Sequence, residues 1–305
     1  MALSGARIGA NLSAGAFVPQ VYSAKMQDKF YASSAVASIA NTAWQGDING
    51  FGDKVVIRKV PTVNISDYSV NAPITYQDIS DEQIILNIDQ QKFYAFRVDY
   101  IDDYQSDLAL IEKITEDASW QMKVAVDKAV LQGIPASIAL ANTVGWSGTA
   151  VQIGNATAIP LATLTAASSL QPLQYAQEVL DYQNVPRDGE RWAVISNHYA
   201  NILKQGPLAQ AYFTGDTTSP IRNGLIGEID GLKVYMSNNI LNANGTSAAA
   251  SNCLVGHSSA LAFASQFMKH RQLELPDTFG WGISGLNVFG YKLVKPEAAV
   301  LVPLY

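Results

Sequence analysis

The chain has 305 residues, of which 48% are hydrophobic and only 15% are charged, against about 25% charged residues in an ordinary globular domain. This composition excludes a long disordered chain, and the net charge of −6 argues against a dedicated nucleic-acid binder, which is usually basic. Because charges are so scarce, we expect much of the surface to be covered, most simply by other copies of the chain.

Metal, disulfide and membrane chemistry find little support in the residue counts. The single cysteine, Cys253, excludes an intrachain disulfide, and three histidines are too few for a histidine-rich metal centre. No apolar run approaches the roughly 20 residues that span a bilayer. The first residues also lack the basic start and apolar stretch of a signal peptide. We therefore expect no membrane partner and no cofactor.

The N-terminal region is predicted to hold an arm and a helix. Residues 1–19 are dominated by alanine, serine and glycine, a composition typical of a flexible arm. Between residues 21 and 40, apolar residues recur at steps of three and four, which predicts a helix. Glycines at positions 46, 50 and 52 then end it.

Between residues 53 and 100 the hydrophobic period changes to two, which is typical of strands. The alternating sets are Val56–Val60, Ile84–Ile88 and Tyr94–Tyr100, and the polar segment 64–81 separates the first two. We expect a long β-hairpin with a large tip. Its apolar faces are too short to form a core of their own.

A long helix is predicted from Asp103 to about Leu131. Acidic residues at its start complement the helix dipole, and Gly133 follows its end. Apolar residues at three- and four-residue steps define one buried face. Two pairs of opposite charges lie four residues apart, Lys113 with Asp117 and Lys123 with Asp127. Roughly 28 residues give a rod of about 42 Å, which suits a strut.

The second half of the chain alternates between helical and strand patterns. We predict helices at 170–182, 197–205 and 259–267, and strands at 192–195, 232–236, 253–255, 286–293 and 298–302. Residues 136–160 and 206–231 are predicted to be loops. This mixture of helices and strands predicts the α+β fold class, and no internal repeat is present.

Two glycine motifs resemble catalytic signatures without their context. Gly280-Trp-Gly-Ile-Ser-Gly285 has the spacing of a dinucleotide site, but no strand precedes it and no helix follows it, which favours a glycine-rich turn. Gly145-Trp-Ser-Gly148 is one residue short of a nucleophile elbow. Any of His198, His257 and His270 is able to assist a serine, yet nothing singles one out.

Three nearby carboxylates, Asp99, Asp102 and Asp103, have the ligand chemistry for a divalent cation. No regular calcium-loop spacing surrounds them, and two stand where a helix start favours negative charge. Helix capping is therefore the preferred interpretation. Taken together, the motifs predict a protein that is not an enzyme.

Six stretches, in order, carry a resemblance to a known family: Gly52–Arg58, Tyr76–Phe93, Phe96–Asp107, Gly231–Asn239, Val255–Ala264 and Gly290–Ala298. They resemble the major capsid protein of tailed bacteriophages, which has the Hong Kong 97 fold. The matching parts of that protein are the extended loop, the approach to the spine helix, the axial-domain strand and turn, and the C-terminal strands. The resemblance covers almost the whole chain beyond the arm.

The resemblance implies a domain plan: an N-terminal arm and helix (1–44), an extended loop (45–100), a peripheral domain with the spine helix (101–135 and 251–305) and an axial domain (136–250). It also implies pentamers and hexamers that close an icosahedral shell around double-stranded DNA. It further implies separate scaffolding and portal proteins and weak, non-specific contact with the DNA. Assembly would take place in the host cytoplasm, and the protein would end up in the virion. No motif marks a lysine–asparagine cross-link.

Charged residues on the loop and the strut give candidate contacts between subunits. Because the hairpin has too little apolar surface to bury itself, we expect it to lie across a neighbouring subunit. Its stem is basic and the strut helix is acidic, so the two are expected to meet, with Arg58 best suited to a bidentate carboxylate contact. The candidate contact residues are Lys54, Arg58, Lys59, Glu112, Glu116 and Asp117.

Two alternatives to a phage shell remain open on the sequence alone. A cellular nanocompartment shell shares the fold named above. A hydrolase that uses one of the three histidines is the alternative outside the shell-forming class.

Overall fold

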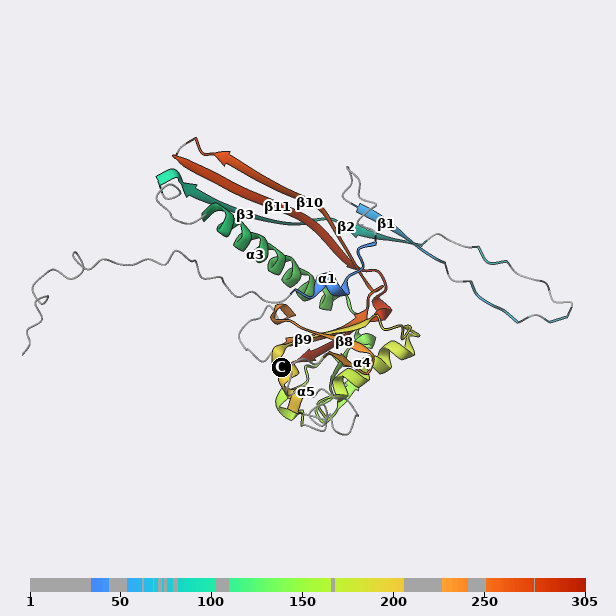
Figure 1. The fold of residues 1–305 in the computed structure, drawn as a ribbon. Helices are drawn as coiled ribbons and strands as arrows, with labels where there is room; N and C mark the ends of the chain where they lie inside the picture. The colour runs from blue at the N-terminus through green and yellow to red at the C-terminus, as the bar shows by residue number, and fades with distance from the viewer. Residues whose placement is uncertain are drawn as a thin grey trace, which may run out of the picture.

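The structure is a computed structural model. It describes residues 34–43, 54–61, 63–67, 69–70, 73, 76–78, 82–101, 110–165, 168–205, 227–240, 251–276 and 278–305. The predicted arm and most of the predicted N-terminal helix lie outside these residues, as do Asp102, Asp103 and most of the loop 206–231. Figure 1 shows an elongated part, in which a long helix runs along a three-stranded sheet, and a second part built around a five-stranded sheet. None of the described helices is long and apolar enough to cross a bilayer.

The elongated part consists of helix α3 and a sheet with strand order β10-β11-β3. The bounds are Leu110–Gly133 for α3, Gln90–Asp99 for β3, Leu261–Glu274 for β10 and Gly280–Leu293 for β11. Each strand pair is antiparallel. The 24 residues of α3 span about 36 Å, which confirms a long strut.

Helix α3 covers one face of this sheet. Phe289 of β11 is fully buried in the main core together with Met122, Val126 and Val130 of the helix. Tyr94 of β3 lies on the same face, above a glycine: a Cβ atom at Gly285 would lie 2.3 Å from the tyrosine ring. The glycine therefore makes room for the ring between sheet and helix.

The β-hairpin consists of β1 (Lys54–Lys59) and β2 (Glu82–Asn87), paired antiparallel from Lys54 opposite Asn87 to Lys59 opposite Glu82. This confirms the hairpin predicted from the period of two. The third alternating run, β3, pairs with β11 and not within the hairpin. At its base the hairpin packs Ile57 and Leu86 against Ala262 and Ala264 of β10, forming a small separate cluster.

The second part has a mixed sheet with strand order β12-β9-β6-β8-β7. The bounds are Arg191–Ile195 for β6, Glu228–Ile229 for β7, Leu232–Met236 for β8, Ser251–His257 for β9 and Ala299–Leu304 for β12. Only the pair β6–β8 is parallel. Helices α4 (Gln171–Tyr182) and α5 (Asn197–Gln205) begin and end within a residue of their predicted bounds.

A buried carboxylate joins the two parts of the fold to the N-terminal segment. Asp127 of α3 is 1% exposed, and its Oδ1 accepts hydrogen bonds from the backbone N–H groups of Ala35 (2.9 Å) and Val36 (2.8 Å) and from the hydroxyl of Ser34 (3.0 Å). Its Oδ2 accepts from the side-chain amide of Asn239 at 2.7 Å. The short helix α1 (Val36–Ile39) is thus fixed to α3 and to the segment that follows β8.

The charge pairs predicted on this helix are wrong in both cases. Lys123 does not pair with Asp127, since the carboxylate is buried; its ammonium lies 5.2 Å from the ring centre of Trp120. The Nζ of Lys113 lies 4.0 Å from Oε2 of Glu116, so Lys113 pairs with the residue before its predicted partner Asp117.

Three predictions for the second half of the chain are also wrong. The segment 259–267 is not a helix but opens the 14-residue strand β10, because β11 supplies a full-length partner for it. Gly280–Gly285 is not a turn but the start of β11, where a Cβ atom at Gly280 would lie 2.4 Å from the carbonyl oxygen of Val98. Within the predicted loop 136–160, β4 (Val144–Trp146) and β5 (Val151–Ile153) form a hairpin.

Candidate functional site

The basic stem of the hairpin presents its cations to solvent. Lys54, Arg58 and Lys59 all lie on β1 with exposed side chains. Arg58 stands opposite Gln83 across the hairpin, and Lys59 opposite Glu82. Within the described part of the chain, neither Lys54 nor Arg58 forms an ion pair. The ammonium group of Lys54 and the guanidinium group of Arg58 are therefore available to another chain.

The acidic candidates lie along the N-terminal half of α3. Glu112 and Glu116 are exposed and Asp117 is half-buried. Asp117 accepts a hydrogen bond from Gln121 at 2.5 Å, one turn further along the helix. The described chain brings none of these acids against Lys54 or Arg58 of the same chain. If these groups meet, they do so between copies, and the predicted contact stays a prediction.

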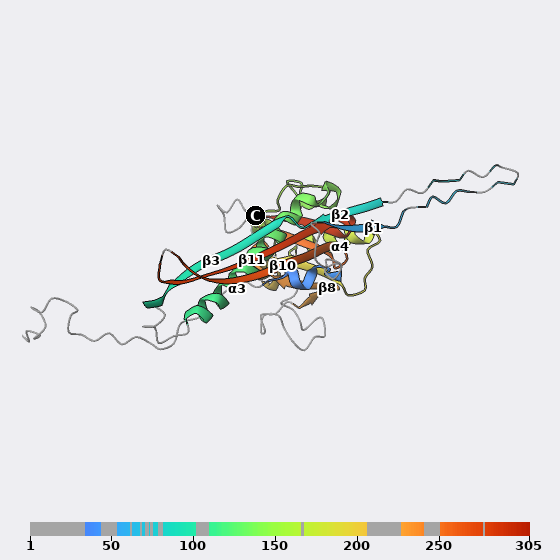
Figure 2. The same ribbon diagram turned by 90° about the horizontal axis from the view of Figure 1, so that it is seen from above.

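The hairpin also exposes large apolar side chains far beyond its base. Ile65 is 98% exposed, Tyr76 91% and Val60 86%. Burying these side chains against another chain would remove apolar surface from water, which is favourable. Figure 2 shows how far the hairpin projects from the rest of the fold.

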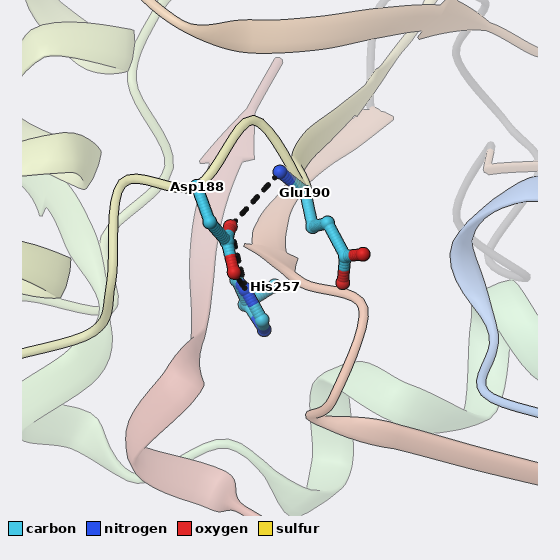
Figure 3. Close-up of side chains that lie close together, drawn as sticks. All are labelled: Asp188, Glu190 and His257. Carbon is cyan, nitrogen blue, oxygen red and sulfur yellow. Dashed lines mark hydrogen bonds and ion pairs between the residues drawn. The ribbon is translucent and has the colours of Figure 1, made fainter.

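One cluster of titratable side chains lies at one end of the five-stranded sheet, where β9 ends and β6 begins (Figure 3). His257, at the end of β9, is 5% exposed, and its Nε2 lies 3.1 Å from a carboxylate oxygen of Asp188. Glu190 stands beside them, and ligand atoms of the three residues lie within 4.8 Å of one another. This cluster joins residues 69 positions apart, and nothing in the local sequence indicated it.

The hydrogen bonds of His257 indicate which ring nitrogen carries the proton. The Nδ1 atom accepts the backbone N–H of Ser259 at 3.1 Å, so the proton of the neutral ring sits on Nε2 and is donated to Asp188. The hydroxyl of Ser259 also lies 2.9 Å from Nδ1. The cluster ties the turn after α4 to the end of β9.

The other motifs weighed in the sequence also lie outside any reactive arrangement. His198 on α5 and His270 on β10 are exposed. Ser147 closes the tight turn between β4 and β5 by exchanging hydrogen bonds with Ala150. Asp99 accepts the backbone N–H of Ile101 at 2.9 Å, consistent with a capping role for that carboxylate.

An arginine pair holds the turn between α4 and β6. Arg191 is 2% exposed and donates to Asp181 at 2.8 Å, while Arg187 donates to the same carboxylate. Hydrogen bonds from Arg187, and then from Arg191, lower the pKa of Asp181 from 3.8 to about 2. The carboxylate thus remains charged well below the usual range for aspartate.

This shift predicts a dependence of stability on acid. Because the folded-state pKa is lowered, the contribution of Asp181 is fully present above pH 4 or so and disappears as the pH falls toward 2. We expect the free energy of unfolding of the wild-type subunit to fall more steeply between pH 5 and pH 2 than that of Asp181→Asn. Urea unfolding at each pH measures this. Glu228→Gln, which removes an exposed carboxylate elsewhere, is the control, and equal slopes in wild type and Asp181→Asn would contradict the prediction.

The chain was compared with known proteins by sequence and by structure. No known family model and no curated protein matches the sequence. Solved structures do match. A structure from Mycobacterium phage Che8 is 26% identical with a TM-score of 0.76, covering 94% of this chain and 97% of its own. The capsid of Cyanophage P-SCSP1u is 15% identical with a TM-score of 0.73, covering 95% and 93%. The capsid of a native GTA particle is 10% identical with a TM-score of 0.65, covering 97% and 98%.

These full-length likenesses show the fold. The chain has the α+β fold of these phage and GTA capsid structures.

Proposed function

We propose that the chain assembles into pentamers and hexamers that close an icosahedral shell around double-stranded DNA. The observation that carries this proposal, and with it the role of a major capsid protein in the virion, is the likeness to capsid structures over 95–97% of the chain. Capsid assemblies imply homo-oligomers, and the projecting hairpin agrees with this because apolar side chains beyond its base, such as Val60, Ile65 and Tyr76, are exposed. The shell is proposed to assemble with scaffolding and portal proteins and to make only weak, non-specific contacts with packaged DNA.

Electron microscopy of the purified protein tests it directly. Closed shells, or pentameric and hexameric capsomers, are the expected particles, and a stable monomer under all conditions, including with a scaffold present, would contradict the proposal. Shells that never enclose DNA in an infected host would instead favour a cellular nanocompartment.

The contact between the basic stem and the acidic helix of a neighbour is part of this proposal. Arg58 is exposed on β1, and Glu116 is exposed on α3. Each such exposed pair is worth only about 0–1 kcal/mol, but a closed shell repeats it in every subunit. Lys54, Lys59, Glu112 and Asp117 surround the two ends of the contact.

We expect Arg58→Glu to reduce shell assembly while leaving the subunit folded, because like charges then face each other. Adding Glu116→Arg is expected to restore part of the assembly. Sedimentation at low and high salt measures both variants, with Lys295→Glu, a charge reversal at an exposed bend, as the matched control. Normal assembly of Arg58→Glu at both salt concentrations would show that this contact does not exist.

A further inference from the structure

A polar cavity lies between the segment that follows α1 and one face of the five-stranded sheet. Its volume is about 380 Å³, and residues of the segment 38–42 form one wall. The opposite wall consists of Trp192 of β6, Lys233 and Tyr235 of β8, and Glu190 and Ser258 at one end of the sheet.

Hydrogen bonds and close packing hold both walls of the cavity in place. Asn41 donates its backbone N–H to the carbonyl of Leu261 at 2.8 Å and accepts the N–H of Phe263 at 3.1 Å, which fixes the segment to β10. On the sheet, the indole of Trp192 lies close to Gly256 of β9, where a Cβ atom would be 3.0 Å from Cζ2 of the ring. The cavity is therefore preformed, as ligand sites usually are.

Trp192 carries a buried hydrogen-bond donor that has no acceptor. Its side chain is 3% exposed, and its indole Nε1 has no hydrogen-bond partner among the described residues. Buried polar groups are nearly always paired. Because this tryptophan lines the cavity, a molecule bound there is the natural source of the missing acceptor.

Two further donors share the sheet face of the indole. Lys233 stands directly opposite Trp192 in the register of β6 and β8, and Tyr235 follows two residues later on the same face. Within the described part of the chain, neither the ammonium of Lys233 nor the hydroxyl of Tyr235 forms a hydrogen bond or an ion pair, although Glu228 stands opposite Lys233 on β7. Three donors, one of them cationic, suit a carboxylate.

The other end of the cavity is acidic. Glu190 is exposed, and one of its carboxylate oxygens accepts a hydrogen bond from the hydroxyl of Ser258. Asp188 and His257 lie beside Glu190 but do not line the cavity (Figure 3). Asp188 adds a second negative charge at this end, which favours an ammonium group. Glu190 and Trp192 are two residues apart on extended backbone, so about 7 Å separates the two ends.

We propose that this cavity binds a small zwitterion, a molecule with a carboxylate at one end and an ammonium group at the other. The carboxylate accepts hydrogen bonds from the indole of Trp192, the hydroxyl of Tyr235 and the ammonium of Lys233. The ammonium group donates to Glu190. A simple carboxylate would leave Glu190 unmatched, and a simple amine would leave the indole without an acceptor. The site lies within one subunit and goes beyond the assembly proposed above.

Binding of a simple zwitterion tests the ligand class. Saturation-transfer NMR follows the ligand and suits the full-length protein both as a subunit and in a shell. ε-Aminocaproate is the probe, because its chain is long enough to place one charge at each end of the cavity. We expect it to bind with a Kd of about 10 mM or tighter. Hexanoate and hexylamine, which each lack one charged group, are expected to bind about tenfold more weakly.

Substitutions test the role of each end. Lys233→Met and Tyr235→Phe are each expected to weaken the binding of ε-aminocaproate about tenfold, and so is Trp192→Phe, which keeps an aromatic ring but removes the N–H. Glu190→Gln is expected to lower the affinity for ε-aminocaproate to that for hexanoate. Lys269→Met, at an exposed lysine on β10, is the matched control and is expected to bind as the wild type does. Lys233 is exposed and Tyr235 is half-buried, so these two variants keep the test decisive if Trp192→Phe does not fold.

The outcomes separate this inference from the assembly proposal. Absence of ε-aminocaproate binding by the wild type, equally tight binding of hexanoate, or undiminished affinity in Lys233→Met and Tyr235→Phe would each overturn the zwitterion site. A wild type that binds ε-aminocaproate as described but never forms capsomers or shells would support the site and overturn the proposed function.

Discussion

Replacing Asp127 with alanine is expected to lower the free energy of unfolding by about 3–5 kcal/mol. The carboxylate is 1% exposed and accepts four hydrogen bonds from two other segments of the chain, residues 34–36 and Asn239. Without it, the buried N–H groups of Ala35 and Val36 lose their acceptor, and the amide of Asn239 loses one hydrogen bond. Each unsatisfied buried group costs about 1–3 kcal/mol.

Urea unfolding of the unassembled subunit measures this loss. Asp117→Ala, on the same helix but half-buried, is the matched control and is expected to change stability by no more than about 1 kcal/mol. Hydrogen exchange at the amides of Ala35 and Val36 gives a local readout, because those amides lose their acceptor. Unchanged exchange at both positions, with unchanged stability, would show that Asp127 does not hold the N-terminal segment.

Replacing Gly290 with alanine is expected to destabilise the subunit by about 1–3 kcal/mol and to displace the hairpin base from the sheet. A Cβ atom at this position would lie 2.1 Å from the carbonyl oxygen of Asn87 and 2.9 Å from the Cα of Ile88. Both are backbone atoms, so the clash is relieved only if the end of β2 moves. That end is also held by Lys292, whose ammonium donates to the carbonyl of Ile85 at 2.8 Å.

Gly282→Ala, eight residues earlier on the same strand, is the control. A Cβ atom there would lie 3.0 Å from the Cδ2 of Leu275, the end of a flexible side chain that is able to move aside. Thermal unfolding compares the two variants, and assembly yields show whether the displaced hairpin still reaches a neighbour. If Gly290→Ala is no less stable than Gly282→Ala and assembles as wild type does, the close approach of hairpin and sheet does not constrain the fold.

Much of the local structure was predictable because it depends on residues that are close in sequence. The alternation around Ile57 and Ile84 predicted β1 and β2, and the helical spacing predicted α4 and α5 nearly to the residue. The basic stem and acidic helix were visible as charges on predicted elements, and the resemblance drawn from element order agrees with the capsid fold. Whether those charges meet between subunits is not decided by a single chain.

The errors arose where a distant segment decides the outcome. Residues 259–267 are small and apolar enough for a short helix, but β11 offers them a strand partner along their whole length. Gly280 and Gly285 look like part of a turn, but the backbone of β3 and the ring of Tyr94 occupy the space that they leave. Asp127 has the spacing of a surface ion pair, yet it is buried and accepts hydrogen bonds from two distant segments, residues 34–36 and Asn239.

The sequence by itself determined the α+β class, the hairpin, the strut and the sign of the charge on each segment, because periodicity and composition are local properties. Only the tertiary structure decided which of these charges share a surface. Arg97 and Arg271 are 174 positions apart, and they join one basic face because β11 pairs with both β3 and β10 in a register that points both side chains away from α3. Register is set by packing against that helix, and no pattern within either strand contains it.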